Sequence, residues 1–437
     1  MNIIIAGAGK VGFNLAKTLC IGHNVTIIDK NEDALHRIQE SLDILPMRGD
    51  VEDANIYNHF IDKKIDLFIA VTNIDNVNLI STLMADSVLE IDRKFVRLQK
   101  HFFADTKVQK KLDIDMLIFP TKLASRAIVS LLDYPRANNV KFFKYTDYRL
   151  ISVRVNEEVD ISQLNSPNFS IVGIEREKAF FIPQEIQTPC NNDLVYFFGK
   201  EEDIKNACHI LDTEDKEEIQ KCVIFGADEL GVSIAKFLLE SKRSVKIVDT
   251  SLELCQKADE VLAGQASVVN LKYGDTTIYD EESLSEADVF IAATNNDEYN
   301  IIKCLEAKDK GITKVMAINN EMEYYSLMHS LGIIVVRGPK MSAYNTIMEH
   351  ISANRVVIEK SFCGSKGFVY MRNIFSNSHC IGKKIKPPKL NSSKIFYIRE
   401  NQLLVLEEKI VLEEADIIVV FSTPKESSKV KQWIYEL

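Results

Sequence analysis

The 437-residue sequence lacks several features that mark particular classes of protein. Glycine and proline contribute only 17 and 10 residues, which excludes collagen-like, low-complexity and disordered chains. No apolar run is long enough to cross a bilayer, and Met1 leads directly into a short apolar run that we expect to be a first strand, not a signal peptide. Basic residues are fewer than acidic residues, 53 against 63, and the net charge of -10 disfavours nucleic acid as a partner.

The eight cysteines lack the spacing that zinc sites and disulfide frameworks require. No pair is arranged as CxxC, and no histidine cluster lies beside any of them. We therefore expect free thiols used as small apolar residues in a reducing compartment, and no metal site. The sequence predicts a soluble intracellular protein.

The chain contains the same pattern twice. The run Gly7–Gly12 returns as Gly226–Gly231, at an offset of 226 − 7 = 219 residues. The offset stays within a few residues along both halves, which is hard to obtain by chance. The further pairs are Ile27–Asp29 with Ile247–Asp249, Gly49-Asp50 with Gly274-Asp275, Phe68–Asn73 with Phe290–Asn295, Val172–Glu177 with Phe396–Glu400, and Asp193–Phe198 with Asp416–Phe421.

Each half divides into a larger and a smaller module. In the larger module, short β-branched runs alternate with helical stretches, which predicts an α/β fold with a Rossmann-like, doubly wound parallel sheet. The smaller module contains short alternating strands and predicts a small α+β subdomain. The predicted domains are 1–140 and 219–352 for the two Rossmann-like units, and 141–212 and 355–437 for the two subdomains. The charge-rich segment Asp212–Glu218 predicts an exposed linker between the halves.

A helix is predicted near the end of each Rossmann-like unit, at Leu123–Asp133 and at Ser342–Ile351. Pro120 and Pro339 precede these helices, and both helices carry apolar faces. Two interpretations remain open. The helices either reach a partner subunit or pack in the core of their own protomer.

The clearest motif is Gly7-Ala8-Gly9-Lys10-Val11-Gly12, which follows a predicted strand and opens a predicted helix. In that context the first glycine permits a tight turn, the second lets the backbone approach a pyrophosphate, and the third lets helix and strand pack closely. The helix N-terminus then offers amide groups to phosphate. Lys10 would add a positive charge, although a solvated lysine at a helix start explains it as well.

Further candidate ligand contacts follow other strands of the same sheet. Asp29 ends the second strand, where a carboxylate can accept hydrogen bonds from both hydroxyls of an adenosine ribose; a plain helix cap is its alternative role. Thr72 and Asn73 end the fourth strand and suit ribose or phosphate contacts, or else form a turn. Arg97 ends the fifth strand and would meet phosphate, or else lie on the surface, and Gly49-Asp50 is a weaker candidate. A carboxylate at Asp29 would repel a 2′-phosphate, so NAD(H) or an adenine nucleotide is favoured over NADP(H).

The second copy departs from the motif at two positions. Asp228 replaces the middle glycine, and Glu229 replaces the equivalent of Lys10, so two carboxylates face the place where a pyrophosphate would lie. We therefore expect the first half to bind NAD(H) better than the second. The residues that remain as weaker candidates are Gly226, Gly231, Asp249, Thr294 and Asn295.

Taken together, the doubled motifs resemble the TrkA family of Trk potassium-uptake regulatory proteins. The residues that carry the resemblance are the Gly7–Gly12 loop, Asp29, Gly49-Asp50, Ala70–Asp75 and Asn78, with their second copies. The resemblance covers essentially the whole chain and implies two tandem RCK modules, each with a small C-terminal subdomain.

The resemblance also implies a function. Such a protein is a peripheral cytoplasmic subunit that assembles as a ring beneath a membrane potassium-translocating subunit of the Trk type, and bound nucleotide gates the pore. The residues that would hold NAD(H), or else ATP or ADP, are Gly7, Ala8, Gly9, Lys10, Val11, Asp29, Thr72, Asn73 and Arg97. Gln99 stands where members often have another arginine, which makes ATP the less secure ligand.

Two other functions are compatible with the sequence. One is a sensor subunit of a different cation channel or antiporter. The other is an NAD-dependent dehydrogenase, which needs a proton donor beside the nicotinamide. The candidates His101, His209 and His329 have no obvious orienting carboxylate, and the small module is short for a substrate domain. We therefore expect no catalytic activity.

Overall fold

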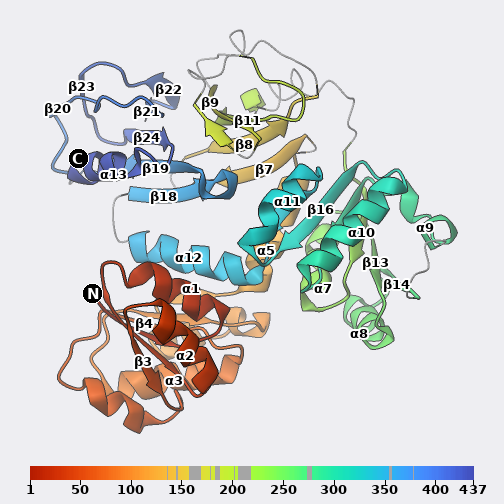
Figure 1. Cartoon of the computed structure of the whole chain (residues 1–437), viewed down its shortest axis with the longest axis horizontal. Coiled ribbons are helices and arrows are strands. Elements are labelled where there is room, and N and C mark those ends of the chain that lie inside the picture. The colour runs from red at the N-terminus through yellow and green to blue at the C-terminus, as the bar shows by residue number, and fades with distance from the viewer. Residues whose placement is uncertain are drawn as a thin grey trace. The chain divides into compact units, whose positions relative to one another are not determined.

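The computed structural model describes residues 1–134, 136–143, 146–156, 169–177, 179–182, 188–200, 202–204, 218–272, 278–353, 357–376 and 378–437. The chain forms two compact units (Figure 1). The first unit contains Met1–Arg126 and Arg337–Met348. The second contains Ala127–Val336 and Glu349–Leu437.

A six-stranded parallel sheet forms the centre of the first unit. Its two central strands, β1 and β4, are buried apolar runs. The strand order is β3-β2-β1-β4-β5-β6, the doubly wound arrangement with a switch point between β1 and β4. Ile3 pairs with Val25 on one side and with Leu67 on the other, so the carboxyl ends of the central strands lie together. The strands are β1 (Asn2–Ala6), β2 (Asn24–Asp29), β3 (Leu45–Arg48), β4 (Leu67–Ala70), β5 (Lys94–Arg97) and β6 (Met116–Ile118).

Helices connect these strands. Helix α1 buries Val11, Leu15 and Leu19, which recur at helical spacing. Asn31 caps helix α2, because its side chain accepts a hydrogen bond from the Ala34 amide at 3.1 Å. The helices are α1 (Lys10–Leu19), α2 (Glu32–Ser41), η1 (Ala54–Phe60), α3 (Asp75–Val88), η2 (His101–Asp105), α4 (Val108–Lys111) and α5 (Pro120–Leu132).

The second unit contains a second sheet of the same kind, in the order β14-β13-β12-β15-β16-β17. Its strands are β12 (Lys221–Phe225), β13 (Ser244–Asp249), β14 (Ser267–Asn270), β15 (Val289–Ala292), β16 (Lys314–Asn319) and β17 (Ile334–Arg337). The accompanying helices are α7 (Glu229–Glu240), α8 (Leu252–Leu262), α9 (Ile278–Glu281), η4 (Leu284–Glu286), α10 (Asp297–Asp309), η5 (Met322–Tyr324), α11 (Tyr325–Ser330) and α12 (Pro339–Ala353).

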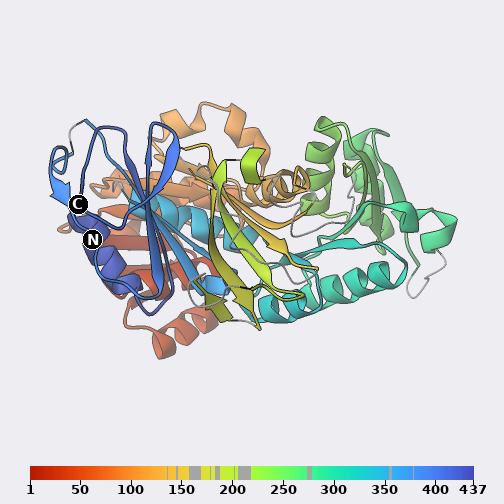
Figure 2. The ribbon, with the colours of Figure 1, turned by 90° about the horizontal axis from the view of Figure 1, so that it is seen from above.

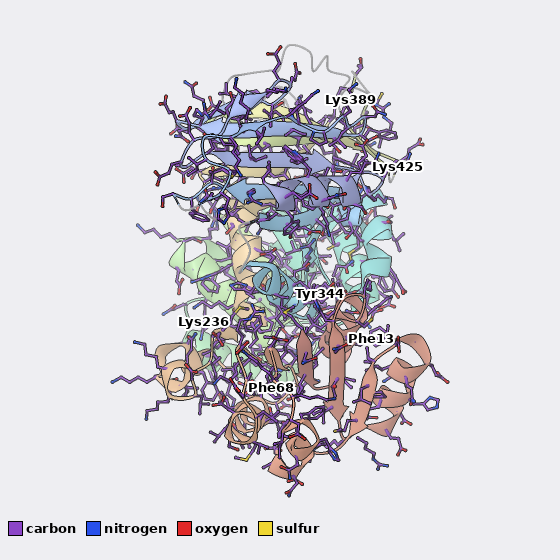
Figure 3. The ribbon with its side chains drawn as sticks, turned by 90° about the vertical axis from the view of Figure 1, so that its left-hand side faces the viewer. Phe13, Phe68, Lys236, Tyr344, Lys389 and Lys425 are labelled. Atoms are coloured by element: carbon purple, nitrogen blue, oxygen red, sulfur yellow. The ribbon has the colours of Figure 1, made fainter. Side chains whose placement is uncertain are left out.

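Helix α12 follows the last strand of the second sheet, but most of it belongs to the first unit. The Tyr344 hydroxyl lies 2.8 Å from Thr18 Oγ1 of helix α1, and Figure 3 labels Tyr344 of α12 and Phe13 of α1 within this unit. The predicted helix at Ser342–Ile351 therefore packs within its own protomer, as the second interpretation held, but against the first half of the chain and not the half that contains it.

Two antiparallel sheets in the second unit follow the Rossmann-like units in the chain. They pack face to face (Figure 2). In their shared core the rings of Phe198 and Phe421 lie 5.1 Å apart. The first sheet has the order β10-β9-β11-β8-β7, with β7 (Ala137–Phe142), β8 (Tyr148–Arg154), β9 (Phe169–Arg176), β10 (Ala179–Phe181) and β11 (Leu194–Lys200).

The second of these sheets has the order β18-β19-β24-β21-β22, and helix α13 (Ser427–Glu436) packs on its other face. Its strands are β18 (Val357–Phe362), β19 (Gly367–Asn373), β21 (Ser393–Arg399), β22 (Gln402–Val405) and β24 (Ile417–Ser422). The short turn η6 (Cys363–Ser365) and the ribbon of β20 (Lys384–Ile385) and β23 (Ile410–Val411) complete it.

The predicted fold class is confirmed: two doubly wound parallel sheets, each followed in the chain by a small antiparallel unit. The predicted linker lies almost entirely outside the described residues, as do Gly274 and Asp275.

Candidate functional site

The first glycine-rich loop joins β1 to α1 with the geometry that the motif predicts. Gly7 has φ +111°, a conformation that favours glycine, and its amide donates to the Ile28 carbonyl at 2.9 Å. A Cβ on Gly12 would come within 1.9 Å of the Gly7 carbonyl oxygen, so the third glycine is required for close packing. A Cβ on Gly9 would meet nothing within 4 Å. The loop is tight at its ends and open at its middle glycine.

The N-terminus of helix α1 has no side-chain cap. Gly9 is the N-cap residue, and the first turn of the helix contains no acidic residue. Lys10 is exposed at the start of the helix. The first amides of an α-helix have no partner within the helix and carry partial positive charge. This end of α1 is therefore suited to an anionic group such as a phosphate.

Asp29 lies beside the loop and holds it. Its carboxylate accepts hydrogen bonds from the Ala8 amide at 2.6 Å and from the Asn31 amide at 2.8 Å. Asp29 does not cap helix α2, because Asn31 has that role. Each carboxylate oxygen has a second lone pair, so Asp29 can still accept from the hydroxyls of a ribose.

Thr72, at the end of β4, is positioned by a buried asparagine. The Asn78 side chain accepts from the Thr72 amide at 2.8 Å and from its hydroxyl at 2.7 Å. The Asn78 amide group donates to the carbonyls of Thr72 and Arg97 at 3.0 and 2.8 Å. Asn78 therefore holds the ends of β4 and β5 together. Thr72 Oγ1 also accepts from the Ile74 amide at 3.3 Å, so Thr72 takes part in a turn as well.

Arg97 is not a plain surface arginine, because only 6% of it is exposed. Its guanidinium donates to Asn73 Oδ1 at 3.1 Å, and the Gln99 side chain donates to the Asn73 carbonyl at 3.1 Å. A buried arginine at the carboxyl edge of the sheet supplies positive charge where doubly wound folds bind ligands.

Two residues that were not predicted as site residues hold the backbone of the site in place. Asn78 is one, and Asp75 is the other: its carboxylate accepts from the amides of Gln99 and Lys100 at 2.7 and 2.9 Å. Their signal in the sequence is duplication, because Asn300 and Asp297 repeat the same bonds in the second half.

The second loop has a different environment. Asp228 is the N-cap of helix α7, and its Oδ1 accepts from the amides of Leu230 and Gly231 at 2.9 and 3.2 Å. Its Oδ2 accepts from the side chain of Asn295 at 3.2 Å. Burial raises the pKa of Asp228, the two backbone hydrogen bonds lower it, and the charge of Asp249 adds to the increase.

The remaining residues of the second site keep the roles seen in the first. Asp249 accepts from the Ala227 amide at 2.7 Å and from the Ser251 amide at 2.8 Å. Thr294 is held by Asn300 as Thr72 is held by Asn78. Gly226 has φ +116°, and a Cβ on Gly231 would lie 1.8 Å from the Gly226 carbonyl oxygen. The backbone framework of the first loop is therefore retained in the second. The space that is open at Gly9 in the first loop is occupied by the Asp228 side chain in the second.

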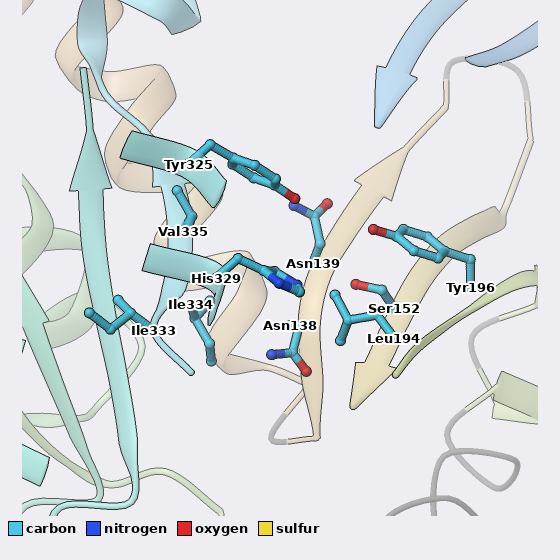
Figure 4. A pocket seen from close by; sticks show the side chains of 10 residues that line it. All are labelled: Asn138, Asn139, Ser152, Leu194, Tyr196, Tyr325, His329, Ile333, Ile334 and Val335. Atoms are coloured by element: carbon cyan, nitrogen blue, oxygen red, sulfur yellow. The ribbon is translucent and has the colours of Figure 1, made fainter. Parts of the chain in front are cut away.

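A small pocket with a mixed polar and apolar lining lies elsewhere in the second unit (Figure 4). The side chains of His329 and Tyr325, from helix α11, point toward Asn138, Ser152 and Tyr196. Burial lowers the pKa of His329. The cavity measures about 20 Å³, far below the roughly 300–1,000 Å³ of ordinary ligand pockets, so we assign no ligand to it.

Among the described residues, no group of three His, Cys, Asp or Glu side chains is arranged to hold a metal ion. In the same part of the chain, no helix combines the length and the apolar character needed to cross a bilayer.

Comparison with known proteins agrees with this architecture. The TrkA-N domain model matches twice, at residues 3–120 and 222–339. A Trk system potassium uptake protein TrkA homolog of Archaeoglobus fulgidus is 28% identical over 99% of both chains. The Trk system potassium uptake protein TrkA of Halomonas elongata is 26% identical over 97% of this chain and 96% of its own.

Solved structures of similar fold include an RCK domain and an ion channel. The GsuK RCK domain has a TM-score of 0.61 at 16% identity and covers 100% of this chain and 95% of its own. A GsuK channel bound to NAD has a TM-score of 0.62 at 16% identity, covering 100% of this chain and 79% of its own. GsuK bound to ADP has a TM-score of 0.52 at 15% identity, covering 81% and 70%.

These findings first define a class for the chain, the proteins that contain two RCK-type folds in tandem. Within that class, the chain belongs to the TrkA family of potassium uptake proteins, with two TrkA-N domains, as the sequence resemblance predicted.

Proposed function

We propose that the chain is a regulatory subunit that binds NAD(H) in its first half and passes the state of that site to a membrane potassium-translocating subunit. ADP and ATP are the alternative ligands of the same site. The nucleotide is bound and not transformed. The protein acts at the cytoplasmic face of the membrane.

The observation that carries this proposal is the open, uncapped loop at Gly9. The loop presents helix amides at the carboxyl edge of the sheet, and it leaves space where a Cβ would meet no atom within 4 Å. Gly7, Ala8, Gly9, Lys10 and Val11 would line the pyrophosphate.

The charges around the loop suit a diphosphate. Lys10 and Arg97 supply two positive charges, and Asp29 supplies a carboxylate on the ribose side of the loop. Thr72 and Asn73 would complete the site at the end of β4. A 2′-phosphate would lie against Asp29, which favours NAD(H) over its phosphorylated form.

Relatives support the partner and the ligand class. The curated relatives are Trk system potassium uptake proteins, and two solved neighbours are described as bound to NAD and to ADP. A ligand shifts a gate only through its different affinity for two states, and coupling of about 1–3 kcal/mol per site is typical.

A homo-oligomeric ring is part of the proposal, and a surface repeated in both halves supports it. Helix α3 exposes Ile80 and Leu83, and helix α10 exposes Ile302 and Leu305 at the matching positions. Apolar side chains left exposed three residues apart on both copies suit contact with another copy of the chain.

The direct test is a thermal-shift titration of the intact chain with NADH, NAD, ADP and ATP. We expect NADH to raise the melting temperature of the wild type and to have little effect on Asp29→Ala. Asp249→Ala is the matched control, because Asp249 holds the second loop through the same pair of amide hydrogen bonds. A shift that survives in Asp29→Ala and disappears in Asp249→Ala would contradict the proposed site.

Two further measurements address the partner and the absence of turnover. Co-purification with a Trk-type membrane subunit and nucleotide-dependent potassium flux would support the regulatory role. Consumption of NADH with hydroxy or keto acids would contradict it in favour of a dehydrogenase.

A further inference from the structure

The two glycine-rich loops have the same backbone. The first glycines, Gly7 and Gly226, have φ of +111° and +116°. The N-cap residues, Gly9 and Asp228, have φ/ψ of −69°/−176° and −75°/−174°. The two loops therefore differ in their side chains and not in their conformation.

In the second loop, one side chain occupies the place that the first loop leaves open. Asp228 Oδ1 accepts hydrogen bonds from two amides of the first turn of α7, and Oδ2 accepts from Asn295. These are the kinds of donors that a phosphate oxygen would use at this position. In the first loop no side chain caps α1.

The charges around the two loops are also reversed. Asn78 donates to the Arg97 carbonyl, and Asn300 donates to the Ile318 carbonyl, which makes Ile318 the counterpart of Arg97. Lys10 corresponds to Glu229. At the four positions compared, the first half has two cations and one carboxylate, Lys10, Arg97 and Asp29. The second half has three carboxylates and no cation at the same positions, with Asp228, Glu229 and Asp249 as the acids.

We propose that the Asp228 carboxylate is a permanent internal occupant of the phosphate position in the second half, so that each chain binds one dinucleotide, in its first half. Asp228 is then a specificity-determining residue that excludes diphosphate ligands from the second Rossmann-like unit. That unit keeps a structural role. The statement about the first half rests on the proposed function, whereas the role of Asp228 can be tested separately.

The test exchanges the two loops in the full-length chain and counts bound NADH by isothermal titration calorimetry. We expect one NADH per chain for the wild type, two for Asp228→Gly/Glu229→Lys, and none for Gly9→Asp. The Gly9→Asp side chain has room, and it should add a helix cap, so a melting temperature at or above that of the wild type shows that its loss of binding is not unfolding.

Asp228→Asn separates occupancy from charge. An asparagine can keep the hydrogen bonds from Leu230 and Gly231 without the negative charge, so we expect this variant to bind one NADH, like the wild type. Two NADH bound by the wild type or by Asp228→Asn would overturn the proposal. So would a folded Asp228→Gly/Glu229→Lys chain that binds no more than the wild type.

The same titrations distinguish the failure of this proposal from that of the proposed function. If the wild type binds no NADH and Asp228→Gly/Glu229→Lys binds one, Asp228 is the occupant and the assignment of the first site is wrong. If Gly9→Asp binds as the wild type does, a carboxylate at this position does not exclude the ligand, and the proposal is wrong.

Discussion

Single buried side chains set the geometry of the strand ends beside both glycine-rich loops. Asn78, 1% exposed, makes four hydrogen bonds that join Thr72 to Arg97, and Asn300 repeats this arrangement in the second half. A hydrogen-bonded polar side chain is stable when buried because its donors and acceptors are all used. At this scale, the two halves share their framework and differ in the few side chains that would face a ligand.

The buried side chain of His329 should make the stability of the protein depend on pH. Burial lowers its pKa; Glu175 opposes the shift, while Arg154 and Lys366 add to it. The unfolded chain therefore takes up the proton more readily than the folded chain. The contribution of His329 to the free energy of unfolding is fully present above about pH 6.5 and is lost as the pH falls below that value.

We expect the melting temperature of the wild type to fall between pH 7.5 and pH 5.5 by more than that of His329→Gln, which has no group that titrates there. Differential scanning calorimetry at both pH values measures the difference. Equal pH dependence in the two proteins would show that His329 is not the group responsible.

At the scale of elements, helix α12 comes from the second half of the sequence but packs in the compact unit of the first half. It follows the second Rossmann-like sheet, but Arg337–Met348 belong to the first compact unit. Ala343 and Ile347 are completely buried on this helix. A fragment containing only the first half of the sequence would therefore lack a helix that its own compact unit includes.

Ile347→Ala should destabilise the first unit by about 2–5 kcal/mol, because it removes buried apolar volume without replacing it. Hydrogen–deuterium exchange of the full-length chain would locate the effect. We expect faster exchange in β1 and α1, which lie more than 300 residues away in the sequence. Tyr344→Phe, which loses one exposed hydrogen bond, is the mild control. Faster exchange confined to residues 218–336 would contradict this assignment of α12.

At the scale of the whole molecule, the two halves each leave an apolar pair exposed on the same helix of the fold. Ile80 and Leu83 on α3 correspond to Ile302 and Leu305 on α10. Retention of the pair in both copies indicates a shared surface, and contact between copies of the chain would bury it.

Leu83→Asp and Leu305→Asp should each weaken self-association, because each places a charge within an apolar contact. Light scattering after size-exclusion chromatography measures the mass of the assembly. Ile21→Asp is the control, since Ile21 is 87% exposed outside these helices. An unchanged mass for both leucine variants would remove these helices from the proposed ring interface.

Much of the protein could be predicted from the sequence. The duplication, the doubly wound sheets and the loop at Gly7–Gly12 are local patterns, because strand and helix periodicity and glycine conformation depend on neighbours in the chain. The family followed from these motifs. The positions of Asp29 and Thr72 against the loop also followed, since the carboxyl ends of parallel strands meet at one edge.

Other features were decided only by the tertiary structure. The burial of Arg97, its bond to Asn73, the four bonds of Asn78 and the position of α12 all depend on residues that are distant in sequence. The sequence could place two acids in the second loop, but it could not show that Asp228 turns back onto the amides of its own helix. Periodicity records which face of an element is buried and does not record which element covers it, so such pairings appear only when the chain is folded.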